Sequence, residues 1–227
     1  MKLKNLSLVI LAKNERENLR FILPKAQKYS HDVLVIDGNS NDGTKELCKE
    51  LKVRFYLDNN RGKGDAQRVG CKKAKKKFII FIDGDGAHDF KDINKIYGLL
   101  LKNNDLVICS RQTGGSYDLN FQDGFKSAIR ASGVIFLVSL FNILFKTNFT
   151  DILYSFKGIS KKNFTRLKTS ENGFAIEIDI LARSVIKRLR IIEIPSRENA
   201  RIFGQSKLPT IVGLYFIYFI IYKSILK

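Results

Sequence analysis

Short apolar runs alternate with helix-like segments throughout the first half of the sequence. Five runs are typical of strands, the first of them a buried one: Leu6–Ala12, Asp32–Asp37, 53–58, Phe78–Asp83 and 105–110. The segments between them space their apolar residues as helices do, at 14–29, 43–52, 64–77 and 92–103. Asn14 is the expected N-cap of the first helix. This alternation predicts an α/β fold with a mostly parallel, doubly wound sheet.

The predicted strands end in polar loops rich in Asp, Asn, Gly and Arg. These loops read DGNSNDGT, NNRGKGDA, DGDGAHD and SRQTGGS. Ligands of such sheets bind beyond the carboxyl ends of the strands, so the loops predict one shared site. The most informative loop begins with Asp83-Gly84-Asp85. Two close carboxylates at a strand end suit a hard divalent cation that also holds phosphate oxygens.

Other common ligand motifs do not match. An EF-hand loop that starts at Asp83 requires an oxygen ligand, Gly and Glu where Ala87, His88 and Asn94 stand. No G-x-x-x-x-G-K-[ST] phosphate loop and no G-x-G-x-x-G fingerprint occur. The two histidines have no motif of a Ser-His-Asp hydrolase around them. The sequence therefore argues against Walker-type NTPases, dinucleotide-dependent dehydrogenases and serine hydrolases.

The net charge favours anionic partners. The chain carries 40 Lys and Arg against 22 Asp and Glu, a formal charge of +18. Such an excess suits nucleic acid, acidic lipid headgroups or phosphorylated substrates. A basic module that binds membranes or nucleic acid without turnover remains a remote alternative. It explains the charge but not the ordered polar loops, so we expect no nucleic-acid partner.

Two apolar stretches follow the alternating half. Residues 133–145 form either a core helix or an interfacial helix, and residues 211–222 form a second apolar run. At ~1.5 Å per helical residue, twelve residues cover only ~18 Å of a ~30 Å hydrocarbon core. A tilted or shallow membrane helix fits this run better than a full span. We therefore expect a catalytic domain at 1–207 and an apolar, membrane-associated helix at 208–227.

Taken together, the motifs resemble those of a known family. The segments LSLVILAKNERENL, VIDGNSNDGT, NRGKGDAQRVG, FIDGDGAH and CSR, in this order and spacing, resemble family 2 glycosyltransferases with the nucleotide-sugar-binding A fold. The match covers about residues 6–207. TDILYSFKGISKKNF and IIEIPSRENARIFGQSKL further resemble polyprenyl-phosphate sugar transferases such as dolichol-phosphate mannosyltransferase.

The resemblance implies a role for each matching position. The donor nucleotide is expected at Leu11, Ala12, Asn14, Glu15, Asp37, Lys63 and Asp83, with Asp37 accepting a hydrogen bond from the base. Asp83 and Asp85 are the expected ligands of Mg²⁺ or Mn²⁺ on the diphosphate and, with Arg111, the expected catalytic residues. The acceptor phosphate is expected at Arg111, Arg130, Arg201 and Lys207, with Lys126 a rival of Arg130.

Two positions depart from the family pattern. Ala87 stands where the family often has a Gln that helps to hold the metal, so His88, Asp89 or water is left as a third ligand. Ser155 stands where a Gly is usual. Many family members also carry clear transmembrane spans after the catalytic domain, whereas this chain has at most one short apolar run there.

The resemblance implies an inverting transferase that moves a sugar from a GDP- or UDP-sugar to a polyprenyl phosphate. We expect it at the cytoplasmic face of a membrane, peripheral or shallowly anchored. The main alternative is a family 2 transferase that acts on a glycan hydroxyl in the synthesis of cell-surface polysaccharide. A neutral hydroxyl needs a general base, for which Glu177 and Asp179 are the candidates. An anionic lipid phosphate needs none.

Overall fold

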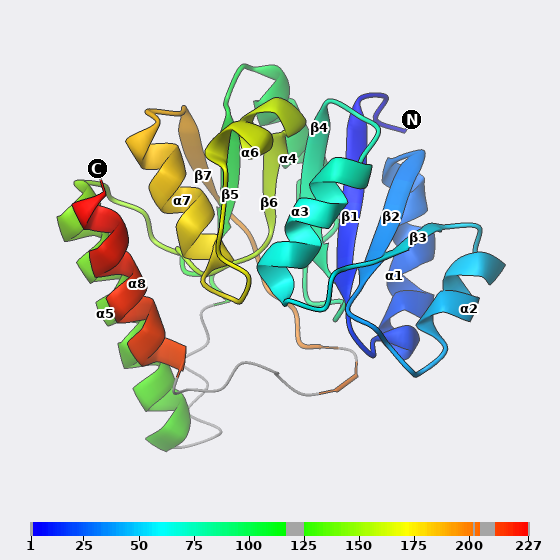
Figure 1. The fold of residues 1–227 in the computed structure, drawn as a ribbon, viewed down its shortest axis with the longest axis horizontal. Coiled ribbons are helices and arrows are strands. Elements are labelled where there is room, and N and C mark those ends of the chain that lie inside the picture. Colours follow the sequence, from blue (N-terminus) through cyan, green and yellow to red (C-terminus); the bar gives the residue numbers. More distant parts are fainter. Residues whose placement is uncertain (1, 117–124, 202, 205–211, 227) are drawn as a thin grey trace.

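The computed structural model describes residues 2–116, 125–201, 203–204 and 212–226, with only the backbone of 125–131. A seven-stranded sheet in the order β3-β2-β1-β4-β6-β5-β7 forms its centre (Figure 1). The strands are β1 Leu6–Ala12, β2 Asp32–Asp37, β3 Arg54–Leu57, β4 Phe78–Asp83, β5 Leu106–Ser110, β6 Lys157–Ser160 and β7 Ile191–Pro195. The helices are α1 Arg16–Tyr29, α2 Thr44–Glu50, α3 Lys63–Lys73, α4 Asp92–Leu101, α5 Phe125–Phe145, α6 Lys161–Leu167, α7 Ile176–Ile186 and α8 Val212–Ile225.

The sheet confirms the predicted α/β class. β1 pairs in parallel with β2 and β4, β2 with β3, and β5 with β7. β6 lies between β4 and β5 and is antiparallel to both. Its four residues are too few for a clear periodic pattern, and neither it nor β7 was predicted from the sequence.

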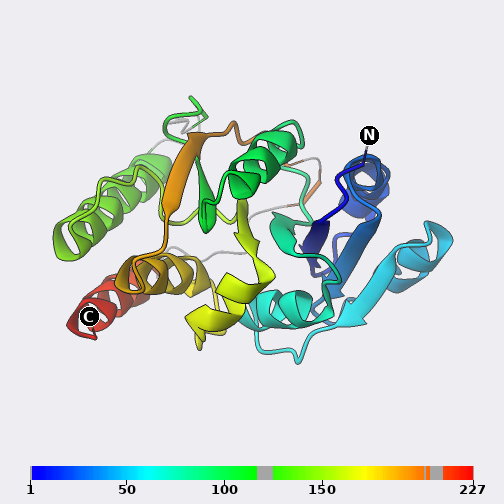
Figure 2. The ribbon, with the colours of Figure 1, turned by 90° about the horizontal axis from the view of Figure 1, so that it is seen from above.

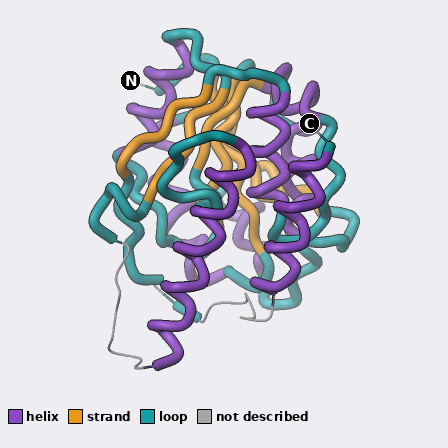
Figure 3. Tube along the Cα trace, turned by 90° about the vertical axis from the view of Figure 1, so that its left-hand side faces the viewer, coloured by secondary structure: helices purple, strands orange, loops and turns teal. Residues whose placement is uncertain are grey.

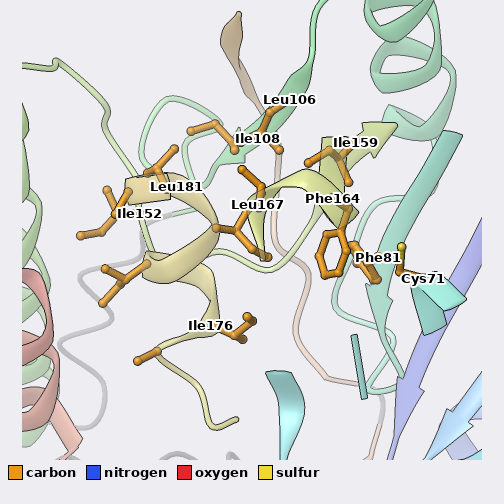
Figure 4. Packing of buried hydrophobic residues seen from close by; sticks show 14 of the residues in the cluster. Cys71, Phe81, Leu106, Ile108, Ile152, Ile159, Phe164, Leu167, Ile176 and Leu181 are labelled. Carbon is orange, nitrogen blue, oxygen red and sulfur yellow. The ribbon is translucent and has the colours of Figure 1, made fainter. Parts of the chain in front are cut away.

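Helices cover both faces of the sheet, because successive strand residues point to opposite sides. Val9 and Leu11 join the core under α3, α5, α6, α7 and α8, whereas Leu8 and Ile10 join the core under α1, α2 and α4. Figure 2 shows α3 and α4 on opposite sides of the strands. Figure 4 shows the first core, in which Phe81 of β4 packs against Phe164 of α6 with ring centroids 5.2 Å apart.

Helices α5 and α8 lie side by side at the end of the sheet next to β7 and α7 (Figures 1 and 3). Phe216, Phe219 and Ile220 of α8 are buried in the same core as α5 and α7. Lys223 of α8 forms an ion pair of 2.8 Å with Asp179 of α7, which is fully buried. Among the described residues, no helix has the length and apolar character needed to cross a membrane.

The start of α1 differs from its prediction. The helix begins at Arg16 with Glu15 in the N-cap position, and no side chain caps it, so the assignment of Asn14 as the N-cap is wrong. Asn14 instead has a positive φ of 52°, and its Oδ1 accepts a hydrogen bond of 3.0 Å from the N–H of Asn41. This bond ties the loop after β1 to the loop after β2.

Candidate active site

A cavity opens where the strand order reverses. From β1 the chain proceeds outward to β2 and β3, whereas β4 lies on the other side of β1, and ligands of doubly wound sheets bind at such a point. The cavity has a volume of about 460 Å³. It is lined by Leu11, Ala12, Lys13, Glu15, Gly38, Asp58, Asn60, Gly62, Lys63, Ala66, Asp83, Gly84, Asp85, Phe174 and Arg201.

Both carboxylates of the Asp-Gly-Asp loop line this cavity, and each contacts a cation of the chain. Nζ of Lys63 lies 2.9 Å from Oδ1 and 3.0 Å from Oδ2 of Asp83. A guanidinium nitrogen of Arg201 lies 2.9 Å from Oδ2 of Asp85, whose Oδ1 accepts the N–H of Ala87 at 3.1 Å. Two carboxylates and two cationic side chains therefore meet at the end of β4.

Glycines allow the close approach of the segments that carry these groups. Gly84 donates its N–H to the carbonyl oxygen of Leu11 at 2.8 Å, and a Cβ there would lie 3.0 Å from that oxygen. Gly64 packs α3 against the loop before α7, where a Cβ would lie 2.1 Å from the carbonyl oxygen of Glu171. Since this contact is impossible for a larger residue, Gly64 brings Lys63 and Phe174 to the same wall.

Lys63 bridges the half-buried Asp83 and the buried Glu177. Its Nζ is also 3.4 Å from Oε1 of Glu177 on α7, and Glu177 in turn pairs with Lys157 and accepts a hydrogen bond of 2.9 Å from Gln67. Burial alone would lower the pKa of Lys63, but Asp83 and Glu177 outweigh it and raise the pKa. Lys63 is therefore a fixed positive charge beside Asp83.

Asp83 is held ionised by its surroundings. Burial by itself raises a carboxyl pKa, but the charge of Lys63 and a hydrogen bond of 2.6 Å from Oγ of Ser155 together place the pKa of Asp83 below its ordinary value. The neighbouring His88 is buried, which lowers its pKa despite Asp83 and Asp85 nearby. Its imidazole is therefore neutral at physiological pH.

Arg111 does not line the cavity. Its guanidinium donates hydrogen bonds of 2.7 and 3.1 Å to the fully buried carboxylate of Asp151 and one of 3.3 Å to Glu198. It also lies over the ring of Tyr154, 4.9 Å from the centroid. A role for Arg111 at the diphosphate or the acceptor phosphate stays a prediction.

The structure brings together seven of the predicted site residues. The cavity wall contains Leu11, Ala12, Glu15, Lys63, Asp83, Asp85 and Arg201. Asn14 and Asp37 are not part of this wall; both oxygens of Asp37 accept hydrogen bonds from Ser40, at 2.5 and 2.8 Å. Their donor-binding roles stay predictions.

Three predicted acceptor-binding residues cannot be placed fully. Arg130 and Lys126 belong to α5 by their backbone, but their side chains lie outside the described part of the structure. Lys207 lies outside the described residues altogether.

Sequence reasoning missed two wall residues of interest, Asp58 and Phe174. Asp58 follows β3 at the end of a predicted strand, and its position there could have suggested it; burial raises the pKa of its carboxyl. Phe174 lies in the loop before α7, for which no motif exists, and Lys63 lies 6.0 Å from its ring centroid. Only the folded chain reveals its place.

The two candidate bases are both engaged. Glu177 is bound by Lys157, Gln67 and Lys63, as described above. Asp179 is fully buried and accepts hydrogen bonds from Arg183 at 2.6 Å and from the N–H of Ser170 at 3.0 Å, in addition to its ion pair with Lys223. Burial raises the pKa of Asp179, but Lys223 and Arg183 outweigh it and lower the pKa. Asp179 connects α7 and α8 and is absent from the cavity wall.

The donor set fits a divalent cation only in part. Within the described ranges, no group of three or more His, Cys, Asp or Glu side chains could enclose a metal ion. Asp83 and Asp85 nevertheless offer hard carboxylate oxygens on the cavity wall. They suit a cation such as Mg²⁺, which takes one or two carboxylates and completes its shell with phosphate oxygens and water.

Known proteins are similar to this chain in sequence and in fold. Residues 7–170 match the model of glycosyl transferase family 2. Glycosyltransferase AglJ of Haloferax volcanii is 25% identical over 166 residues, which are 73% of this chain and 53% of AglJ. Dolichol-phosphate mannosyltransferase of Pyrococcus furiosus is 25% identical over 211 residues, which are 89% of this chain and 58% of that protein. The chain thus spans little more than half the length of these two relatives.

A solved structure extends the comparison to the fold. Glucosyl-3-phosphoglycerate synthase from Mycobacterium tuberculosis, crystallised with Mn²⁺, UDP and glucosyl-3-phosphoglycerate, superposes with a TM-score of 0.72 at 18% identity. The match covers 96% of this chain and 78% of the synthase. With the family model matching most of its length, the chain belongs to glycosyl transferase family 2.

Proposed function

We propose that the protein is an inverting glycosyltransferase that moves a sugar from a nucleotide-sugar donor to a polyprenyl phosphate at a membrane surface. The observation that carries this proposal is the meeting of two carboxylates, Lys63 and Arg201 in one cavity at the reversal of the strand order. Family 2 membership supports the donor class, and the donor could be a GDP- or UDP-sugar.

The residues of the cavity suit the departure of a nucleoside diphosphate. Asp83 and Asp85 would hold Mg²⁺ or Mn²⁺, which supplies positive charge to the diphosphate when it is bound. The Mycobacterium tuberculosis synthase, which has a similar fold, was crystallised with Mn²⁺ and UDP, and this supports the assignment. Lys63, fixed beside Asp83, adds charge that is already in place as negative charge develops on the leaving group.

The acceptor phosphate is assigned to the opposite side of the sugar, so that attack inverts the anomeric centre. An ionised phosphate can attack without a general base, and positioning by cations then suffices. This agrees with the state of Glu177 and Asp179, which are both bound by cations of the chain. Arg201 would pass from Asp85 to the acceptor phosphate, with Arg111, Arg130 and Lys207 as further predicted partners. The relative from Pyrococcus furiosus, by its name, acts on dolichol phosphate.

An apolar surface on α5 and α8 supports the lipid acceptor. Large hydrophobic side chains are exposed on both helices: Ile135, Phe136, Ile143, Leu214, Tyr215, Tyr218, Ile221, Tyr222 and Ile225. Interfacial helices place such residues into the headgroup region. The end of α5 that begins at Phe125 projects beyond the sheet (Figure 1). We assign this surface to peripheral or shallow association with the cytoplasmic face of a membrane, and we keep 208–227 as the proposed membrane-associated segment.

A donor panel tests the proposed reaction. UDP- and GDP-sugars are incubated with a short polyprenyl phosphate and Mg²⁺ or Mn²⁺, and the product is treated with mild acid. We expect transfer from one nucleotide class and an acid-labile sugar–lipid phosphate. An acid-stable glycoside formed only with a glycan acceptor would reject the lipid acceptor in favour of a hydroxyl.

Two variants test the assigned residues. Asp85→Ala should abolish transfer, whereas Asp105→Asn, just before β5 and absent from the cavity wall, should not. Arg201→Ala should raise the KM of the acceptor far more than that of the donor, and Arg197→Ala in the same exposed segment should change neither. Full activity of Asp85→Ala would remove the carboxylates from the mechanism.

A further inference from the structure

Asp83, His88 and Ser155 are connected by hydrogen bonds into a closed ring. The backbone N–H of Asp83 donates to Nδ1 of His88 at 3.4 Å. Nε2 of His88 lies 3.2 Å from Oγ of Ser155. Oγ of Ser155 donates to Oδ2 of Asp83 at 2.6 Å. The ring starts and ends on the same aspartate.

The chemistry of the groups gives the ring a single direction. A backbone N–H can only donate, so Nδ1 of His88 accepts and carries no proton. The proton of the neutral imidazole is then on Nε2, which donates to Ser155. The Ser155 hydroxyl accepts this bond and donates its own proton to the carboxylate of Asp83, which can only accept. Every donor in the ring therefore has an acceptor.

Burial and aromatic contacts hold the two side chains of this hydrogen-bonded ring in place. His88 and Ser155 are each 4% exposed. The imidazole stacks on Phe156 with centroids 4.6 Å apart and an interplanar angle of 18°. It forms a T-shaped pair with the ring of Tyr154, with centroids 5.0 Å apart. Because these contacts fix the plane of the imidazole, the direction of its Nε2–H bond is fixed as well.

We propose that Ser155 and His88 are positioning residues that set the orientation of the Asp83 carboxylate for a divalent cation. This inference rests on the proposed function. Residue 87 is an alanine, so the loop offers no side-chain ligand between Asp85 and His88. His88 cannot fill the gap, because both of its ring nitrogens are used in the hydrogen-bonded ring. With two carboxylates as ligands, the cation depends on how well each is oriented.

The second carboxylate is oriented by the backbone. Oδ1 of Asp85 accepts the N–H of Ala87, as described above, whereas the Asp83 carboxylate is restrained by side chains, the Lys63 ammonium and the Ser155 hydroxyl. Groups that orient metal ligands typically change metal affinity by ~10- to 100-fold when they are removed.

The test compares metal affinity in three variants. Mn²⁺ binding is measured by electron paramagnetic resonance in the presence of saturating UDP or GDP, whichever nucleotide the wild type binds. Ser155→Ala should weaken Mn²⁺ binding about tenfold, the low end of the range for lost orienting groups. Ser155→Thr, which keeps the hydroxyl, should restore most of the affinity. Ser184→Ala removes an equally buried hydroxyl that donates to the carbonyl oxygen of Ile180 at 2.7 Å, and it should have no effect.

A second readout reports on the ring itself. The chain contains two histidines, so nitrogen-15 spectra of the wild type and of a His31→Gln variant assign His88. We expect the pure Nε2–H tautomer. A dominant Nδ1–H tautomer, or unchanged Mn²⁺ affinity in folded Ser155→Ala, would overturn the inference and leave the proposed function standing. Absence of metal-dependent nucleotide binding in the wild type would overturn both.

Discussion

Lys63 offers the sharpest test of the charge balance in the cavity. In Lys63→Met the carboxylate of Asp83 loses the cation that lies within 3.0 Å of both its oxygens. Breaking a fully buried ion pair typically costs ~3–5 kcal/mol. The side chains of Lys63 and Asp83 are 15% and 27% exposed, and Asp83 keeps the Ser155 hydrogen bond, so we expect a smaller loss of about 2 kcal/mol.

The loss converts into a measurable temperature shift. Unfolding entropies of ~2.1 cal/mol/K per residue amount to ~0.5 kcal/mol/K for 227 residues, so Tm should fall by about 4 °C. Calorimetry in EDTA measures this shift, and urea titration measures the free energy of unfolding directly.

A matched substitution on the same helix controls for the loss of a charge. Lys72 of α3 is exposed, and Lys72→Met should leave the Tm almost unchanged. If Lys63→Met in EDTA were as stable as the wild type, or if Lys72→Met lost as much, the ion pair with Asp83 would not stabilise the fold and the reasoning would be refuted.

Three further predictions follow from the packing and the pKa shifts. In Gly64→Ala the new Cβ would lie 2.1 Å from the carbonyl oxygen of Glu171, so the loop that carries Phe174 should be displaced. Nucleotide binding measured by calorimetry should weaken about tenfold or more. Unchanged affinity would contradict this contact. Gly98 lies inside α4, and a Cβ added there would meet no atom within 4 Å. Because glycine weakens a helix interior relative to alanine, Gly98→Ala should raise the free energy of unfolding by ~0.5–1 kcal/mol in urea titration. A loss of stability would show that the helix is packed differently. The pKa of Asp179 is lowered from 3.8 in the folded protein, so its contribution to stability is present above that value and is lost as pH falls through the folded-state pKa. The unfolding free energy of Asp179→Asn should therefore depend less on pH in the acid range than that of the wild type, and parallel curves would reject the assignment.

The sequence was sufficient for the elements whose residues interact locally or in a regular pattern. The strands at Leu6–Ala12, Asp32–Asp37 and Phe78–Asp83 were predicted with their observed bounds, because buried strands of a parallel sheet are continuous apolar runs. The meeting of the loops that carry Lys63 and Asp83 also followed from the sequence, whereas the place of Leu11 was implied by the family resemblance. The carboxyl ends of parallel strands lie at one edge of the sheet, and this holds for any side chains along the strands.

Other parts of the site depend on contacts between distant segments. The antiparallel insertion of β6 between β4 and β5 brings Ser155, two residues before this strand, to Asp83. The pairing of Arg201 with Asp85 and the place of Phe174 beside Lys63 likewise need the folded chain.

By itself, the sequence determined the α/β class, the edge of the sheet at which the site lies and the acids at its centre, since apolar periodicity and loop position are local properties. Only the tertiary structure decided which cation neutralises each acid and which hydroxyl orients Asp83. The physical reason is that such contacts depend on the packing of β6, α7 and the segment after β7. No local pattern in the sequence encodes that packing.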